Sequence, residues 1–228
     1  MRLMKITLAC LSLTGLMLVA CNNTKEDEDK QLKDELFNEA KQDSLFEFGK
    51  TVGYEIKGTI TNNDSTSHYT AAMKGNVIYM HCEEGSGGGW NYMVATLSDD
   101  GSSYCATPYK NDLSMFGEPI YRDGSVFKSF FHSSIEIFLE ASKPAIYENS
   151  KYVGDDMILG LNVYKFEYSS IWGGVVNNIT TYVEGEYGLT LKYVNKYVEG
   201  EKVNQTIEKN VTSIKKGDDV IIPEFNKA

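Results

Sequence analysis

The sequence has little cysteine, little proline and few basic residues. Its 228 residues include 4 cysteines, 4 prolines and 3 histidines, and 22 Lys and Arg stand against 32 Asp and Glu, which gives a formal net charge of −10. Nucleic acids and anionic lipid surfaces both require clustered Lys and Arg, so this composition argues against either as a partner. We expect no nucleic-acid partner, and the remaining candidates are neutral, cationic or apolar molecules.

The few histidines and cysteines do not form a motif for metal binding or catalysis. His68, His81 and His132 show no H-E-x-x-H spacing, and the sequence has no C-x-x-C pair. His81 and Cys82 are adjacent on an expected strand, so their side chains point to opposite faces and are poorly placed to share a nucleophile–base hydrogen bond. The sequence therefore predicts no metal, no cofactor and no enzymatic activity.

The sequence also lacks a hydrophobic run long enough for a comfortable membrane span. Its main apolar stretch, residues 6–19, follows Arg2 and Lys5 and is succeeded by acidic residues, where a stop-transfer signal would have Lys and Arg. A positive start, a short apolar core and a small residue, Ala20, are the three parts of an export signal. Cys21 follows directly.

The four residues from Leu18 to Cys21 read L-V-A-C and resemble the lipobox of bacterial lipoproteins, [LVI]-[ASTVI]-[GAS]-C. The resemblance implies that residues 1–20 are a signal peptide, that Cys21 becomes the first mature residue, and that it carries a diacylglyceryl thioether and a further acyl chain such as palmitate. Two or three acyl chains make release from a membrane very slow, since each buried CH₂ contributes about 0.8 kcal/mol. The chain is then anchored to the cell membrane or the outer membrane, with its domain outside the cytoplasm. The alternative is an ordinary secretory signal with a chance cysteine.

Two cysteines, Cys82 and Cys105, remain in the folded part, because Cys10 leaves with the signal and Cys21 is acylated. An exported pair can form a disulfide, which would contribute about 3 kcal/mol by restricting the unfolded chain. Two buried free thiols on neighbouring strands are the alternative, and the sequence does not decide between them.

The folded part begins after a charged segment. Residues 22–30 contain six charged side chains and no apolar one, so we expect residues 21–30 to form an acylated anchor and a tether. Apolar residues then recur at helical spacing over 31–48, which predicts an amphipathic helix that is broken or loosened near Ser44, with Gly49 just past its end as a C-cap.

From residue 51 onward the apolar period changes to two. Alternating segments recur about every ten residues, separated by turn sequences such as K-G-N and D-D-G, which is typical of an antiparallel meander. One aromatic helix interrupts the meander, with an apolar stripe from Val126 to Ala141 and Pro144 just beyond its end. Too few strands are apolar on both faces for two packed sheets. We therefore expect an α+β fold, a single large curved antiparallel sheet (a half-barrel of about ten strands) with two helices covering its concave face.

This order of elements resembles the LolA/LolB-like fold of lipoprotein carriers and of related lipid-binding lipoproteins of the cell envelope. The segment Y-V-E-G-E-Y-G-L-T-L-K-Y is similar to the W-x-D-x-x-x-G-L-P-L-K hairpin of that family, and I-K-K-G-D-D-V-I-I-P is similar to its closing segment. The resemblance implies a single domain over residues 31–228 that shelters acyl chains in an apolar cavity between sheet and helices.

The side chains expected to line such a cavity come from the aromatic helix and from three strands. They are Phe127, Phe130, Phe131, Ile137, Phe138, Tyr164, Phe166, Leu189 and Leu191. The function implied is non-catalytic binding of a lipid, acyl chain or other apolar ligand by a membrane-anchored protein. The alternative is that the same side chains pack into a filled core, and that the domain is an interaction module for an envelope protein partner.

Replacing Cys21 with Ala is expected to abolish acylation, because the thioether cannot form without the thiol. Metabolic labelling with a palmitate analogue should then show no acyl label, and gel migration should show an unprocessed precursor. Cys10→Ala is the matched control, since this cysteine lies inside the signal, and it should keep both label and processing. Continued labelling of the Cys21→Ala chain would contradict the lipobox.

Overall fold

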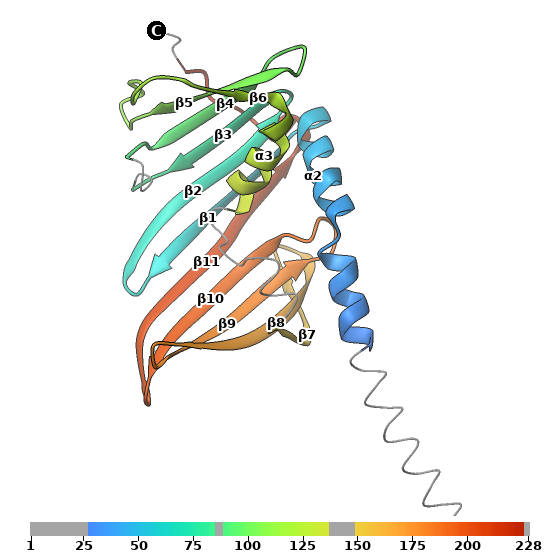
Figure 1. The fold of residues 1–228 in the computed structure, drawn as a ribbon, viewed down its shortest axis with the longest axis vertical. Helices are drawn as coiled ribbons and strands as arrows, with labels where there is room; N and C mark the ends of the chain where they lie inside the picture. Colours follow the sequence, from blue (N-terminus) through green and yellow to red (C-terminus); the bar gives the residue numbers. More distant parts are fainter. Residues whose placement is uncertain (1–26, 85–88, 137–148, 226–228) are drawn as a thin grey trace, which may run out of the picture.

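The computed structural model describes residues 27–84, 89–136 and 149–225, which form one antiparallel sheet of 11 strands (Figure 1). The strands are β1 (Tyr54–Asn62), β2 (Ser65–Lys74), β3 (Val77–Cys82), β4 (Tyr92–Leu97), β5 (Ser103–Tyr109), β6 (Ile120–Asp123), β7 (Lys151–Ile158), β8 (Leu161–Trp172), β9 (Val175–Glu184), β10 (Thr190–Glu199) and β11 (Lys202–Lys216). Their spatial order is β6-β5-β4-β3-β2-β1-β11-β10-β9-β8-β7. Two meanders, β1–β6 and β7–β11, are therefore joined where the first strand pairs with the last.

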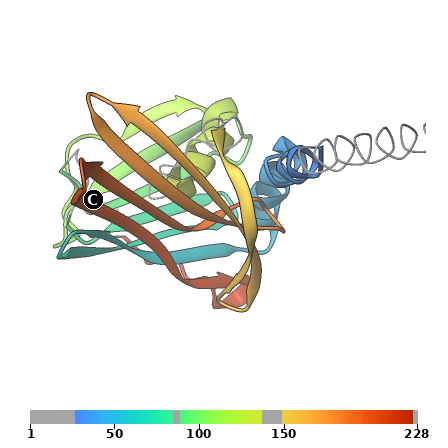
Figure 2. The ribbon, with the colours of Figure 1, turned by 90° about the horizontal axis from the view of Figure 1, so that it is seen from below.

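The helices pack on the inner, concave face of this sheet (Figure 1). They are a helical segment at residues 27–36, α2 (Glu39–Thr51) and α3 (Phe127–Glu136), with single 3-10 turns η1 (Gly124–Val126) and η2 (Gly217–Asp219). Seen from below, the sheet curls so that its two edges turn toward each other (Figure 2). The expected α+β half-barrel is confirmed, with 11 strands in the described residues where about ten were expected. The short strand β6 was missed, because all four of its residues are exposed and show no apolar alternation.

The first predicted helix is divided, but not where the sequence suggested. The helical segment ends at residue 36, and α2 begins after Asn38, whose side chain accepts a hydrogen bond from the backbone N–H of Ala40. An Asn at this position is a strong helix start, because it pairs an amide that would otherwise lack a partner. The predicted break near Ser44 is wrong, since the Ser44 hydroxyl donates to the carbonyl of Ala40 within α2.

The packed part also begins earlier than residue 31. Residues 27–30 are helical, and Asp29 pairs with Lys33 at 3.0 Å and accepts a hydrogen bond from the backbone N–H of Tyr152 at 3.2 Å. The end of the expected tether is thus part of a helix that contacts the start of β7. Residues 1–26, which include the signal peptide and Cys21, lie outside the described residues, and their assignments stay predictions.

The core consists of two clusters on the inner face and one on the outer face. The first inner cluster lies under α2 and α3, where the Phe46 ring meets Phe127 at 6.3 Å and Phe131 at 5.7 Å. The second inner cluster is formed by Leu36, Phe166 and Val183, together with Leu32, Phe37, Tyr164 and Tyr168. The outer cluster contains Ala72, Tyr79 and Val220, and Phe225 packs against it. All three clusters lie between residues 32 and 225, so a chain that begins at residue 22 contains the whole core.

No disulfide joins Cys82 to Cys105 in the described part of the chain. Cys82, at the end of β3, belongs to the first inner cluster, whereas Cys105 on β5 borders an outer-face groove with Val94 and Thr107. β4 lies between the two strands, so their backbones are about 10 Å apart. A disulfide needs Cα atoms within about 7 Å, and the two side chains point to opposite faces. The disulfide alternative is therefore wrong.

Replacing Phe131 with Ala is expected to cost about 3–5 kcal/mol in free energy of unfolding, because the ring is fully buried and its removal leaves a cavity between α2 and α3. Urea unfolding of the chain from residue 22, followed by circular dichroism, measures this. Val126→Ala is the matched control. Val126 is 44% exposed, so its truncation should change the same free energy by less than about 0.5 kcal/mol. Equal losses in the two variants would contradict the packing described.

Candidate ligand-binding site

The sheet is split at one end. β10 pairs with β11 only as far as Lys192 opposite Asn210, whereas β11 continues beside β1 until Lys216 lies opposite Tyr54. Residues 211–216 of β11 therefore have β1 on one side and, on the other, the turns that join β9 to β10 and β7 to β8. A cleft of about 500 Å³ occupies this gap, and its volume lies in the range of small-molecule sites.

The cleft has an apolar wall that is continuous with the core. Tyr54 belongs to the first inner cluster, and Leu161 and Ile214, which also line the cleft, pack against the same cluster. The Tyr54 ring contacts Tyr187 at 6.0 Å and Phe48 at 6.5 Å. Burial raises the pKa of both tyrosines well above the usual range, and the nearby glutamates raise them further, so both hydroxyls stay neutral.

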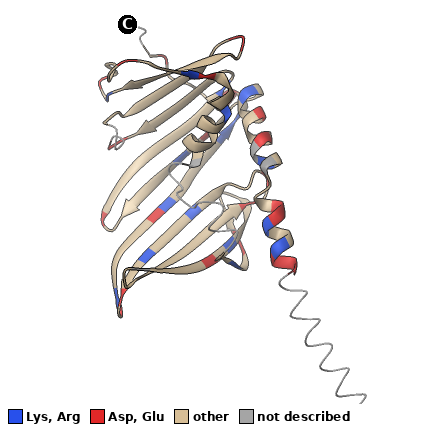
Figure 3. Ribbon diagram, in the orientation of Figure 1, with Lys and Arg blue, Asp and Glu red and all other residues tan. Residues whose placement is uncertain are grey.

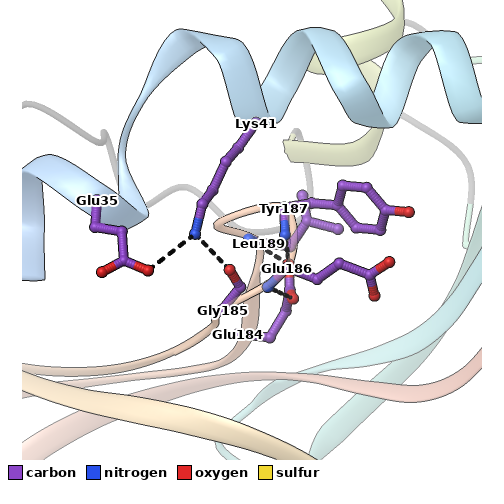
Figure 4. A network of polar contacts seen from close by, with 7 residues as sticks. All are labelled: Glu35, Lys41, Glu184, Gly185, Glu186, Tyr187 and Leu189. Atoms are coloured by element: carbon purple, nitrogen blue, oxygen red, sulfur yellow. Dashed lines mark hydrogen bonds and ion pairs between the residues drawn. The ribbon is translucent and has the colours of Figure 1, made fainter.

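The turn between β9 and β10 is fixed by a buried carboxylate (Figure 4). Glu184 is 3% exposed and accepts hydrogen bonds from the backbone N–H groups of Glu186, Tyr187 and Leu189 at 2.6, 2.9 and 3.0 Å. Three charge-assisted bonds offset the cost of burying the charge and hold one side of the cleft in a single conformation.

The same turn is tied to the helices. Lys41 of α2 donates to the carbonyl of Gly185 at 2.5 Å and pairs with Glu35 of the preceding helical segment at 3.8 Å (Figure 4). Gly188 adopts a φ of +69°, and a Cβ at this position would lie 2.0 Å from the carbonyl oxygen of Leu36. Helix and turn therefore approach so closely that only glycine fits.

An ion pair forms the rim of the cleft. Lys216 donates to Glu186 at 2.8 Å, and its ammonium lies 5.2 Å from the centre of the Tyr187 ring and 5.5 Å from that of Phe48. Burial alone would raise the pKa of Glu186, but hydrogen bonding to Lys216 and Tyr187 outweighs it and lowers this pKa below its usual range. Glu186 is therefore ionised near neutral pH. The cleft combines an apolar wall with a charged mouth, which suits an amphiphilic molecule.

The helix residues predicted to line a cavity lie in the first inner cluster. Phe127 and Phe131 are fully buried against Phe46, and the Phe130 ring is tilted against that of Tyr104, with the centroids 5.5 Å apart. Residues 137 and 138 complete the predicted set, and Ile137 and Phe138 lie outside the described residues.

The predicted strand residues are divided between the two inner clusters. Leu189 and Leu191 belong to the first, whereas Phe166 belongs to the second and Tyr164 packs against it. Leu189 contacts the cleft lining, because its backbone N–H donates to Glu184. A role of any of the nine predicted residues in ligand binding stays a prediction.

The cleft residues themselves were not found from the sequence. Tyr54, Leu161 and Ile214 are ordinary alternating strand positions, and Tyr187 follows a turn. Their convergence depends on the pairing of β1 with β11 and on where β10 stops, which no local pattern encodes. The clearest signal was the E-G-E-Y-G sequence itself, with an acidic residue at the start of a tight turn.

Three further features of the described chain concern metal binding, catalysis and membrane crossing. The described residues hold no group of three or more His, Cys, Asp or Glu side chains able to bind a metal ion. His81 stacks on Tyr92 at 4.4 Å on the outer face, away from Cys82 in the first inner cluster, as the alternation predicted. Within the same ranges, no helix has the length and apolar character needed to cross a membrane.

Matches to known proteins are found among solved structures. Neither a scan against protein-family models nor a search of curated proteins gives a match. Among solved structures, LprF from Mycobacterium bovis shares 11% identity over 87% of this chain and 97% of its own, with a TM-score of 0.38. The Mycobacterium tuberculosis lipoprotein LppX shares 9% over 82% and 98%, with a TM-score of 0.36.

A third similar structure is the Pseudomonas aeruginosa MucA/MucB complex, with 10% identity over 78% of this chain and a TM-score of 0.37. Here the match spans little more than half, 57%, of the other chain. TM-scores below 0.5 say nothing about ligand or partner, so the contacts of this chain itself must support any functional conclusion.

Replacing Glu184 with Gln is expected to loosen the turn. In the parent chain, both carboxylate oxygens accept hydrogen bonds from backbone N–H groups, and the NH₂ group of Gln, which replaces one of these oxygens, cannot accept any. Leaving such a buried donor unpaired costs about 1–3 kcal/mol. Amide hydrogen exchange of residues 186, 187 and 189 should accelerate by about tenfold or more. Glu186→Gln is the control, since Glu186 accepts none of these bonds, and it should leave the exchange rates nearly unchanged. Unchanged exchange in Glu184→Gln would show that the carboxylate does not hold the turn.

Proposed function

We propose that this protein is an exported lipoprotein, anchored to a membrane through Cys21, whose half-barrel binds a hydrophobic or amphiphilic molecule without catalysing a reaction. The observation that supports this best is the cleft at the split of the sheet. Its wall is made by Tyr54, Leu161 and Ile214, all in contact with the first inner cluster, and its mouth carries the Glu186–Lys216 pair.

The arrangement matches the two halves of an amphiphile. An apolar chain that lies against the wall leaves water, which contributes about 0.8 kcal/mol for each buried CH₂. A polar head at the mouth meets one ammonium and one carboxylate, together with the neutral Tyr187 hydroxyl. Since the apolar wall is the surface of the first inner cluster, a small shift of Leu161 or Ile214 would deepen the cleft without breaking the strand ladder.

The expected anchor places this cleft near a lipid source. Five residues, 22–26, separate Cys21 from the first described helical position, and the six Cα–Cα steps span at most about 20 Å. The helical segment that contacts the β9–β10 turn would then lie close to the bilayer. The helical segment adds about 14 Å before Leu36 meets the turn, so the cleft lies within about 35 Å of the acylated residue, where amphiphiles are at high local concentration.

A second candidate function is an envelope protein-interaction module with a filled core. It is favoured by the tight packing of Phe46, Phe127 and Phe131, which leaves these three side chains almost without exposure. It is also favoured by the apolar groove on the outer face, which Cys105, Met115 and Phe225 line.

The test is native mass spectrometry of the chain from residue 22, supported by binding of a fluorescent fatty acid. We expect a co-purifying lipid or saturable binding of the probe. Leu161→Trp should fill the cleft and weaken binding at least tenfold. Ile171→Trp is the matched control on the same strand, since Ile171 is 75% exposed, and it should bind like the parent chain.

Two outcomes would count against ligand binding in the cleft. One is the absence of both co-purifying lipid and probe binding in the parent chain, which would leave the interaction module as the better account. The other is equal binding by Leu161→Trp and Ile171→Trp, which would place the ligand elsewhere in the half-barrel.

A further inference from the structure

The outer face of strands β7–β11 carries a broad polar groove of about 880 Å³. Its lysines project from the face opposite Phe166, which belongs to the second inner cluster, while Tyr168 at its margin packs against that cluster. No described helix covers this outer face (Figure 1). We call it the lysine groove, because Lys151, Lys165, Lys192 and Lys196 all line it.

The strand register explains why the lysines gather there. Lys165 on β8 lies opposite Tyr182 on β9, which lies opposite Lys192 on β10, so these three side chains form one row across the sheet. Lys196 follows Lys192 four residues later and therefore projects from the same face. Lys151 on β7 lies opposite Glu167, two residues beyond Lys165 on β8, which places it on that face as well. Charged positions are marked along these lower strands in Figure 3.

The groove is positive although the protein as a whole is acidic. The lining contains four lysines and two glutamates. Lys165 forms an ion pair with Glu167 at 2.6 Å, and Lys192 forms one with Glu208 at 3.1 Å. Lys151 and Lys196 form no ion pair within the described part of the chain. The groove thus has a formal charge of about +2 on a chain of −10. Such a local reversal of sign attracts an anion that the remaining surface repels.

The rest of the lining resembles the surface that proteins offer to carbohydrates. Hydroxyl and amide groups dominate it, and the ring of Tyr182 stands at its centre with the Lys192 ammonium 5.9 Å from the ring centroid. The polar lining residues are Asn149, Ser169, Asn178, Thr180 and Thr206. Hydroxyls and amides can both donate and accept hydrogen bonds, as sugar or polyol hydroxyls require.

The spacing of the lysines indicates a long ligand. Lys165 and Lys192 are two strands apart, which separates their backbones by about 10 Å, and Lys192 and Lys196 are about 13 Å apart along β10. One phosphate or carboxylate cannot contact all of these ammoniums together. A chain with several negative groups can.

We propose that the lysine groove binds an anionic glycan, a chain of sugar or polyol units that carry carboxylate or phosphate groups. A soluble or wall-bound polymer fits better than a bilayer surface, because a flat bilayer can contact only side chains that protrude from the protein. Lys165 and Lys192 are instead about two-thirds covered, with 33% and 34% of their side chains exposed. The groove and the cleft share no lining residue, so this inference does not depend on ligand binding in the cleft.

Titration with oligogalacturonate, which has one carboxylate per sugar, tests the proposal on the chain from residue 22 at low salt. Isothermal calorimetry should show binding of this probe and none of a malto-oligosaccharide of the same length. Lys192→Gln with Lys196→Gln should weaken binding at least tenfold, and added NaCl should weaken it in the parent chain. Lys50→Gln with Lys202→Gln, which removes two exposed lysines outside the groove, is the matched control and should bind like the parent chain.

Lys196→Glu is a second variant, chosen because Lys196 is exposed and forms no ion pair with the described residues, so the folded state loses none. It should weaken binding more than Lys196→Gln while leaving the circular dichroism unchanged. Failure of oligogalacturonate to bind, equal weakening by the control pair, or equal binding of the neutral sugar would each overturn the proposal. Binding to phosphatidylglycerol vesicles without binding to oligogalacturonate would overturn it in favour of a membrane contact.

Discussion

The pairing of β1 with β11 is the contact on which the rest of the structure depends. It runs from Tyr54 opposite Lys216 to Asn62 opposite Ile207, and it joins two meanders that are otherwise separate hairpin series. Its partners are about 150 residues apart, so the loop that it closes is long and costly in chain entropy. The gain is one continuous sheet whose inner face can bury both clusters under the helices.

The same pairing creates the cleft. β11 is the longest of the described strands, and its two ends pair with different strands. Lys202–Asn210 pairs with β10, and Ile207–Lys216 pairs with β1. Where the two spans cease to overlap, the sheet must open. The β9–β10 turn lies in this opening, and its own backbone amides are satisfied by Glu184 instead of by a strand. A buried carboxylate at the edge of an apolar core is therefore a consequence of topology, and it supplies the polarity that the mouth of the cleft needs.

Local patterns identified the elements well and their assembly poorly. The segments that form β2 (Ser65–Lys74) and β11 (Lys202–Lys216) show period-two alternation bounded by turn residues, which is a strong strand signal. The class of fold followed from the count of such strands and the two helical stripes. The break was expected near Ser44, because apolar spacing alone does not reveal the Asn38 cap, and β6 was missed because it has no buried side to alternate. The split of the sheet and the separation of Cys82 from Cys105 depend on long-range register, which alternation alone does not reveal.

Alternation also explains how one sheet can offer two surfaces of opposite character. On β8 and β10 successive residues point to opposite sides, so Phe166 and Tyr193 face inward while Lys165 and Lys192 face outward. The sequence of these strands looks merely amphipathic, and the net charge of −10 suggests a uniformly acidic exterior. Register alone brings the lysines of different strands into one row. Because each strand contributes only one or two of them, no run of basic residues marks the groove in the sequence. A positive site on an acidic protein is therefore invisible in composition and becomes defined only when the strands are paired.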